Sequence, residues 1–320
     1  MRIVIGIESS CDETAVALVR EDRVILSQAL ATQQAEHAPY GGVVPEIAAR
    51  AHLKQIDHLY VQALAEAKLN IAQVDAVAVT TGPGLIGGVI VGLMLGKAVA
   101  AAANKPFISI NHLEGHALTV RLTHDVQFPY FLLLISGGHC QQLVVRGVGD
   151  YVRLGGTLDD ALGEAFDKCA KMLGLPYPGG PALERAALSG NAKAYDFPRP
   201  LRGTQGCDFS FSGLKTAVRL TIEKEVARAG NLTPEIIVNV AASFEAAVLD
   251  VLDDRVARAL TRAQASYPIT AFAVAGGVAA NQAIGGRLRS MAAAHTLPLV
   301  VAPPALCTDN AAMIAWAGME

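Results

Sequence analysis

The chain has 320 residues, a length that suits two lobes of ordinary size. Apolar residues make up 52% of it and charged residues 17%, which supports a sizeable core and excludes a disordered chain. The formal net charge of −3 at pH 7 excludes a strongly basic, stand-alone nucleic-acid binder, so any nucleic-acid substrate would need a local patch or partner proteins.

The start of the chain reads as a three-stranded hairpin unit. Residues 2–22 give an apolar strand, a turn of small and polar residues and a second apolar strand, and residues 24–30 give a third. Residues 129–156 repeat this pattern in the second half of the chain. Both turns have the composition of a loop that approaches a ligand.

Each hairpin unit is followed by an alternation of strands and helices. In the first half, strands at 75–81 and 106–111 precede helices at about 85–103 and 112–122. In the second half, strands at 269–277 and 297–304 precede helices near 281–291 and 307–318. We therefore expect a duplicated α/β protein with lobes 1–117 and 118–320 around a central cleft, the last helix being able to pack back on the first lobe.

The region between the second hairpin unit and the last two strands is less regular. Residues 182–239 contain a loop rich in Pro, Gly and Arg before Asp208. Two amphipathic helices are predicted at roughly 215–229 and 234–263.

The apolar run that begins at Leu85 resembles a membrane span. It meets Lys97 after about a dozen residues, whereas a bilayer requires ~20. Glycines at positions 88, 92 and 96 recur on one helix face, which favours close packing on a sheet. The five cysteines are scattered without a C-x-x-C pair, and the chain shows no signal region at its start, so we expect a cytoplasmic protein without a membrane.

The sharpest chemical motif is the pair His112 and His116. Histidines four residues apart share one helix face and can hold a single metal ion, with Asp309 as the candidate third ligand. If the two halves face each other across a cleft, His112 and Asp309 converge on it from opposite sides. The alternative interpretation is a pair of surface histidines, with Asp309 serving as a helix N-cap. A zincin-type peptidase is disfavoured, because Glu114 does not stand next to the first histidine.

Three Gly-Gly turns follow strand-like or loop segments at residues 136–139, 178–181 and 275–278. Glycines expose backbone N–H groups and let a phosphate or a base approach closely, although each Gly-Gly alone is more often an ordinary turn. Neither a Walker A motif nor a G-x-G-x-x-G fingerprint is present.

Carboxylates also mark the turn at residues 8–14. Asp12 and Glu13 are candidates to hold a metal or to orient a nucleophile, against the alternative of a solvated turn. Asp167 lies on a predicted helix, where the alternative is a surface charge pattern.

These segments together resemble the TsaD family, the bacterial tRNA threonylcarbamoyladenosine transferases. The strings that carry the resemblance are IGIESSCDETAVAL, HAPYGGVVPEIAAR, TTGPGLIGG, NHLEGH, LISGGHCQQL, LDDALGEAFDKCAKMLGLPYPGGP, DFSFSGLKTAV, AGGVAANQ and CTDNAAMIAWAG. They run from residue 3 to about 318. Departures are few, namely Cys140 where Thr is common and Gly156-Thr157 in place of Glu-Ser.

The resemblance implies an actin/Hsp70/sugar-kinase fold and a metal ion, iron or else zinc, held by His112, His116 and Asp309. It implies that Asp12 and Glu13 take part in catalysis. It also implies a threonylcarbamoyl-AMP site formed by Leu134, Ile135, Ser136, Gly137, Gly138, Asp167, Gly180, Glu184 and Asn281. The implied reaction places a threonylcarbamoyl group on N6 of the adenosine 3′ of the anticodon, in tRNAs reading codons that begin with A, and releases AMP. The implied partners are tRNA, a smaller TsaB-like paralogue of the same fold and a small TsaE-like ATPase.

Three other functions stay open on the residues alone. They are carbamoyl transfer to a hydroxyl of a small molecule, a kinase or ATPase of the same fold, and a non-catalytic scaffold. The intact histidine pair argues against the scaffold.

Overall fold

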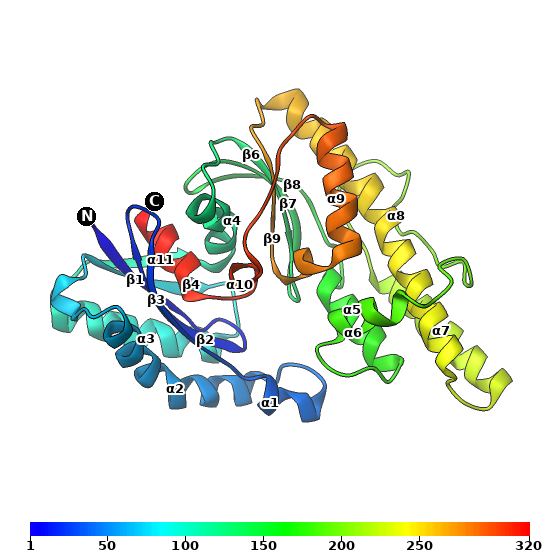
Figure 1. Cartoon of the computed structure of the whole chain (residues 1–320), viewed down its shortest axis with the longest axis horizontal. Coiled ribbons are helices and arrows are strands. Elements are labelled where there is room, and N and C mark those ends of the chain that lie inside the picture. Colours follow the sequence, from blue (N-terminus) through cyan, green and yellow to red (C-terminus); the bar gives the residue numbers. More distant parts are fainter. The chain divides into compact units, whose positions relative to one another are not determined.

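The structure is a computed structural model that describes residues 1–320, apart from the side chain of Ala279. The chain forms two compact units, and Figure 1 labels their elements. Unit 1 comprises Met1–Asp125 and Ala302–Glu320, and unit 2 comprises Val126–Val301. The expected boundary between residues 117 and 118 would cut the helix His112–Thr123, so the units divide after that helix instead.

Unit 1 is built on a five-stranded mixed sheet. Its strands are β1 (Ile3–Glu8), β2 (Glu13–Arg20), β3 (Ile25–Thr32), β4 (Ala76–Gly82) and β5 (Phe107–Asn111), in the order β3-β2-β1-β4-β5. The first three strands pair antiparallel, as the hairpin pattern predicts, whereas β1, β4 and β5 run parallel. The carboxyl ends of β1, β4 and β5 therefore meet at one edge of the sheet.

Helices cover both faces of this sheet. They are α1 (Gln34–His37), α2 (Pro45–Glu66), α3 (Ile86–Ala103), α4 (His112–Thr123), α10 (Pro304–Cys307) and α11 (Ala311–Met319), with short 3-10 turns at Ala38–Tyr40 and Ile71–Gln73. Alternation along β1 divides its side chains between the faces. Ile5 and Ile7 pack with α2 and α3, while Gly6 lies against the backbone of α11.

The glycine stripe of α3 packs on the sheet. An added Cβ at Gly92 or Gly96 would lie 3.5 Å or 3.6 Å from side-chain atoms of Ile7. By length and composition α3 is the single described helix that could cross a membrane, yet 33% of that segment is buried against unit 1. A core helix passes the same length and composition test, so the close packing supports the interpretation made from the glycine spacing.

Unit 2 repeats the connectivity of unit 1. Its strands are β6 (Tyr130–Ile135), β7 (Cys140–Gly147), β8 (Asp150–Gly156), β9 (Phe272–Ala275) and β10 (Leu299–Val301), in the order β10-β9-β6-β7-β8. The hairpin strands β6, β7 and β8 pair antiparallel, and β9 and β10 run parallel beside β6. The strand topology thus confirms the duplication that the sequence pattern predicts.

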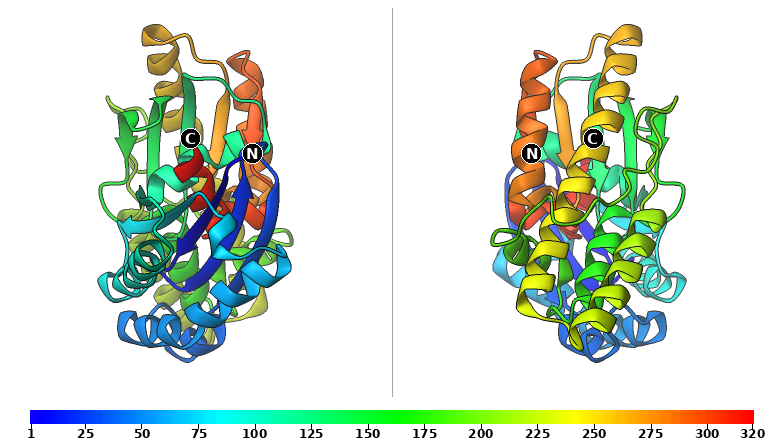
Figure 2. Two further views of the ribbon diagram at one scale, coloured as in Figure 1. Left: turned by 90° about the vertical axis from the view of Figure 1, so that its left-hand side faces the viewer. Right: turned by 90° about the vertical axis from the view of Figure 1, so that its right-hand side faces the viewer.

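The helices of unit 2 enclose a hydrophobic core of their own. They are α5 (Leu162–Met172), α6 (Gly179–Ala187), α7 (Ser212–Ala229), α8 (Pro234–Ser266) and α9 (Gln282–Ala294), with a 3-10 turn at Gly277–Ala280. Figure 2 shows α8 running along the sheet of this unit, where it contacts β6, β7 and β8. Phe131 and Leu133 of β6 are fully buried in this core together with Val248 of α8.

Candidate functional site

The end of β5 positions both histidines. Asn111 caps α4, its side-chain oxygen accepting a hydrogen bond of 2.9 Å from the Leu113 N–H. His112 is therefore the first helical residue, and His116 lies one turn later on the same face. Their side chains are 6% and 2% exposed, so they are not the surface histidines of the alternative interpretation.

Asp309 reaches the histidines because another residue caps α11. Asn310 is the N-cap, and its side chain accepts a 2.9 Å hydrogen bond from the Met313 N–H. The interpretation of Asp309 as the helix cap is therefore wrong. The expectation that His112 and Asp309 approach from opposite halves is also wrong, because α11 packs on β1 and α4 within unit 1.

His112, His116 and Asp309 form a compact cluster. Their ligand atoms all lie within 4.8 Å of one another. Oδ1 of Asp309 lies 3.0 Å from Nε2 of His116 and 3.4 Å from Nε2 of His112. The two imidazole rings meet edge to face, with centroids 4.7 Å apart. Both Nε2 atoms and one carboxylate oxygen thus point to a common centre.

Burial and the neighbouring charges shift the pKa values of this cluster in opposite directions. Burial lowers the pKa of His112, but the carboxylates of Glu8 and Asp309 outweigh this effect and raise that pKa to about 11. Burial raises the pKa of Asp309, but the two imidazoles outweigh it and hold that pKa well below its usual range. Without a metal ion, the cluster therefore holds a positive charge between the carboxylates of Glu8 and Asp309, namely the protonated imidazole of His112.

Asp12 and Glu13 lie beside this cluster without being part of it. They follow β1 at the tip of the first hairpin, where Glu13 opens β2. Burial, followed by the charges of Asp12 and Asp309, raises the pKa of Glu13 to about 9. The hairpin tip is therefore a crowded acidic region rather than the solvated turn of the alternative interpretation.

Sequence reasoning missed the groups that support His112. Nδ1 of His112 lies 3.1 Å from Oε2 of Glu8 and 3.1 Å from Oγ of Ser10. Glu8 is fully buried, and Thr80 donates a 2.5 Å hydrogen bond to it. In the sequence, Glu8 is visible only as an acidic residue at the end of an apolar strand. Its burial depends on three strands that come together in the fold and are far apart in the sequence.

A second group of predicted residues gathers in unit 2, around the turn between β6 and β7. The Ser136 N–H donates to the His139 carbonyl over 2.8 Å, and the His139 N–H donates to Ser136 Oγ over 3.0 Å. Gly163 of α5 packs so closely that its added Cβ would lie 2.7 Å from the Ser136 carbonyl oxygen. Added Cβ atoms at Gly137 and Gly138 would meet no atom within 4 Å. The turn is thus held at its base and open at its tip.

Asp167 connects α5 to the second Gly-Gly turn. Its Oδ1 accepts hydrogen bonds of 2.9 Å from the Gly179 N–H and 3.2 Å from the Gly180 N–H at the start of α6. The carboxylate thus has a positioning role within the protein, which the interpretation as a surface charge does not describe.

Glu184 and Asn281 connect α6 to α9. Oε1 of Glu184 accepts a 2.7 Å hydrogen bond from the Gln282 N–H, and Asn281 caps α9 through the Ile284 N–H at 2.8 Å. Both α5 and β6 contact the 3-10 turn that precedes α9. The residues predicted for a nucleotide site therefore lie around the carboxyl ends of β6 and β9. Leu134 and Ile135 are buried in the sheet as whole residues, being 1% and 0% exposed.

Comparison with known proteins identifies the family. The TsaD family, described as tRNA N6-adenosine threonylcarbamoyltransferase, matches residues 24–316. The proteins of that name from Brucella anthropi and Brucella canis are each 58% identical to the chain over 324 residues, covering 99% of the chain and 89% of their own length. The chain belongs to the TsaD family.

Solved structures resemble this TsaD protein in fold. HypF from T. kodakarensis aligns over 99% of the chain and 47% of its own length, with a TM-score of 0.65 and 14% identity. The ROK hexokinase of Thermus thermophilus aligns over 99% and 97%, with a TM-score of 0.50 and 15% identity. At such identities the likeness concerns the fold alone. It confirms the duplicated actin/Hsp70/sugar-kinase architecture.

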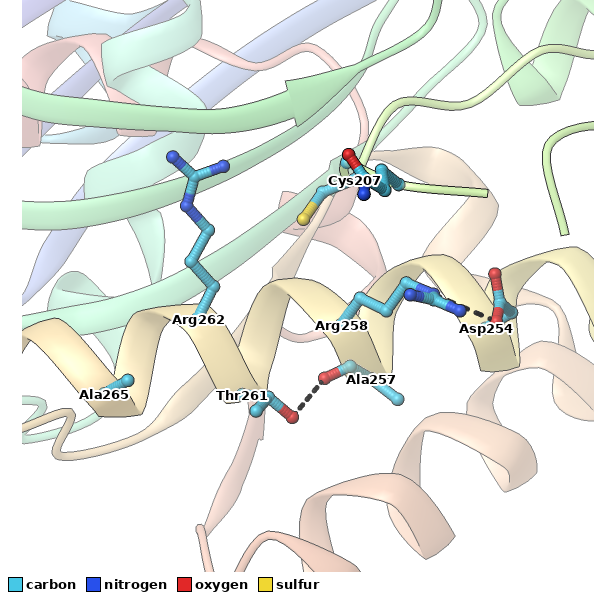
Figure 3. A pocket seen from close by; sticks show the side chains of 9 residues that line it. Cys207, Asp254, Ala257, Arg258, Thr261, Arg262 and Ala265 are labelled. Atoms are coloured by element: carbon cyan, nitrogen blue, oxygen red, sulfur yellow. Dashed lines mark hydrogen bonds and ion pairs between the residues drawn. The ribbon is translucent and has the colours of Figure 1, made fainter. Parts of the chain in front are cut away.

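A separate groove in unit 2 contains none of the predicted site residues. It is lined by Gln205, Gly206, Cys207, Asp254, Ala257, Arg258, Thr261, Arg262 and Ala265. Figure 3 shows Arg258 turned along α8 towards Asp254, with which it forms a 3.1 Å ion pair, whereas Arg262 extends away from that pair. Because this ion pair joins residues one turn apart on α8, it belongs to the surface of that helix.

Proposed function

We propose that this TsaD protein transfers the threonylcarbamoyl group from threonylcarbamoyl-AMP to N6 of the adenosine 3′ of the anticodon, in tRNAs that read codons beginning with A. The identity of 58% over 99% of the chain to proteins named as such transferases carries this proposal. The reaction joins the exocyclic amine to the carbamoyl carbon, breaks the bond from that carbon to the phosphate oxygen and releases AMP.

One divalent metal ion, iron in our proposal and zinc as the alternative, would be held by His112, His116 and Asp309. Two imidazoles and one carboxylate are ligands that first-row divalent metals accept, and three ligands leave positions open for a substrate. When bound, such an ion would stabilise negative charge that develops on phosphate or carbamate oxygens.

We place the adenylate around the Ser136–Gly138 turn, with Asp167, Gly180, Glu184 and Asn281. An added Cβ at Gly137 or Gly138 would meet no atom within 4 Å, so a ligand can come close to this turn, and we propose that its backbone N–H groups hold a phosphate or the adenosine. The exocyclic amine of adenine is a weak nucleophile because its lone pair is delocalised into the ring. Orientation of the two substrates therefore has to supply much of the rate. We propose that Asp12 accepts the proton of the amine, whereas Glu13, whose raised pKa keeps it protonated at neutral pH, orients a substrate by donating a hydrogen bond.

The target adenosine has to lie outside a base stack to be reached, which suits an anticodon loop. With a net charge of −3, the protein needs help to hold tRNA. We propose a smaller TsaB-like paralogue and a TsaE-like ATPase as cytoplasmic partners. The exposed apolar side chains of α2 and α3 suit such docking, namely Leu53, Val61, Ile86, Ile90 and Met94, which are 48–75% exposed.

The test is mass spectrometry of tRNA nucleosides from cells depleted of this protein. The cells are complemented with the wild type, with His112→Ala/His116→Ala, or with the control His124→Ala/His295→Ala, which removes two histidines outside the cluster. We expect threonylcarbamoyladenosine to disappear on depletion and to return with the wild type and the control alone. Normal levels of this nucleoside in depleted cells would overturn the proposal, and carbamoyl transfer to a small-molecule hydroxyl would then take its place.

A further inference from the structure

Glu8 is a buried carboxylate at the meeting point of three parallel strands. It is the last residue of β1 and is hydrogen-bonded by Thr80 of β4, and His112 follows β5 directly. Its side chain is 0% exposed. A buried carboxylate is costly unless hydrogen bonds and opposite charge compensate it, so its partners indicate what the fold uses it for.

Three hydrogen-bonding groups surround this carboxylate. Oε1 accepts a 2.6 Å hydrogen bond from the Ser10 N–H. Oε2 accepts a 2.5 Å hydrogen bond from the Thr80 hydroxyl and lies 3.1 Å from Nδ1 of His112. Ser10 and Thr80 hold the carboxylate in place, and His112 is the remaining partner that it can orient.

The contact with Glu8 determines which nitrogen of His112 is available to a metal. An ionised carboxylate only accepts hydrogen bonds, so Nδ1 of His112 carries a proton when it faces Glu8. When a metal ion takes the place of the second ring proton, Nε2 supplies its lone pair to the ion, and this is the atom that faces Asp309. Among the described residues, Nδ1 of His116 has no hydrogen-bond partner, so His112 is the histidine whose orientation is fixed from behind.

We propose that Glu8 is a positioning residue that fixes the ring and the tautomer of His112, so that Nε2 is presented to the metal ion. This inference rests on the proposed metal site at His112, His116 and Asp309. Glu8 itself does not touch the ion. Carboxylates that hold a ligating histidine from behind raise metal affinity about 10–100-fold in other proteins.

Glu8→Gln is the decisive variant because an amide cannot replace every contact. If its NH2 group takes the place of Oε1, it meets the Ser10 N–H, and two donors face each other. If it takes the place of Oε2, the Thr80 hydroxyl can turn to accept from it, but the amide nitrogen cannot accept from Nδ1 of His112. Nδ1 then either accepts from the amide, with the ring proton moved to Nε2 where it blocks the ligand atom, or donates to Ser10 Oγ alone. In both arrangements the carboxylate that fixes the tautomer is lost.

The experiment titrates the metal-free full-length protein with Co²⁺ in competition with a chelator, and follows the visible absorption of the bound ion. For Glu8→Gln we expect an affinity loss of about 10–100-fold, and for Thr80→Val a smaller loss. Glu114→Gln, which removes one charge from the first turn of α4, is the matched control, and we expect its loss of affinity to stay below about tenfold. In the Zn²⁺-loaded wild type, NMR of labelled histidine should show a protonated Nδ1 on His112.

The possible outcomes separate this inference from the proposed function. If the wild type binds Co²⁺ and His112→Ala/His116→Ala does not, while Glu8→Gln binds as tightly as the wild type, the inference is overturned and the metal site stands. Equal losses in Glu8→Gln and Glu114→Gln would also overturn it, because general electrostatics would explain both. If Glu8→Gln unfolds, Thr80→Val decides, and an unchanged affinity in that variant rejects the role of Glu8. If the histidine variant binds Co²⁺ like the wild type, the proposed metal site itself fails.

Discussion

Replacing Gly6 with alanine should loosen the metal cluster from a distance. Gly6 lies in β1 under α11, and an added Cβ would lie 2.5 Å from the Ala315 nitrogen and 2.9 Å from the Ala315 Cβ. It would also meet the carbonyl oxygen of Ala311. Ordinary contact begins at 3.4 Å, so α11 has to retreat by more than about 0.9 Å, the difference between 3.4 and 2.5 Å, because the Ala311 oxygen lies closer still.

The cost of this shift falls on stability and on metal affinity. The obstacle is helix backbone, which cannot rotate away, so we expect the upper end of the overpacking range, about 3 kcal/mol. That loss lowers Tm by roughly 6–12 °C in a domain of this size. Asp309 precedes α11 by two residues and moves with it, and metal distances tolerate only ~0.2 Å. Co²⁺ affinity should therefore fall at least about tenfold.

Calorimetry of the metal-free protein and a chelator-competition titration measure the two effects. Gly42→Ala is the control, because an added Cβ there meets no atom within 4 Å and the backbone has no positive φ. If Gly6→Ala keeps the Tm and the Co²⁺ affinity of Gly42→Ala, then α11 is not the element that holds Asp309 in place, and the reasoning is refuted.

Two further predictions concern unit 2. Arg255→Ala should lower the free energy of unfolding by about 3 kcal/mol in a denaturant titration. The Arg255 side chain is fully buried and donates a 2.9 Å hydrogen bond to the Thr204 carbonyl. The control is Arg262→Ala, at an exposed position on the same helix, which should change the free energy of unfolding by less than about 0.5 kcal/mol. Asp159→Asn should cost about 1 kcal/mol at pH 7 after discounting for exposure. Burial raises the pKa of Asp159, but hydrogen bonds from the Ser210 and Ser212 hydroxyls and from backbone N–H groups outweigh it and hold the pKa below its usual range. A carboxyl whose pKa is lower in the folded than in the unfolded protein stabilises the fold at pH values above the unfolded-state pKa, and this stabilisation is lost as the pH falls through the folded-state pKa. The difference in unfolding free energy between variant and wild type should therefore shrink below about pH 4. A constant difference down to about pH 2 would contradict this prediction.

The sequence is most informative where structure is local. The strands of both hairpin units and the alternating strands and helices follow from apolar runs and turn residues, and the two sheets have the same order of connection. The spacing of His112 and His116 places them on one face of any α-helix that contains both. The strand topology was therefore predictable, and so was the histidine pair.

The packing of the last helix on the first lobe was expected only as an option, because it depends on a contact over nearly the whole chain that local patterns do not determine. The last helix follows the strands of the second half in sequence, but it packs on the first sheet. Small residues make this close packing possible. A Cβ added at Gly318 would lie 2.6 Å from the Cβ of Ala78 in β4, and a Cβ added at Gly6 would meet the carbonyl oxygen of Ala311. Such complementarity between two small-residue surfaces leaves no periodic signal in either segment.

Asp309 and Glu8 show how position within the fold separates residues that look alike in sequence. Asp309 and Asn310 are both suitable helix caps, and the choice of Asn310 follows from its burial and its bond to the Met313 N–H. That choice leaves the Asp309 carboxylate for the histidines. Glu8 reads as one acidic residue in a turn with Asp12 and Glu13, yet it ends β1, accepts a hydrogen bond from Thr80 and is fully buried. Burial next to His112, rather than the acidic composition of the turn, is what gives Glu8 a distinct role.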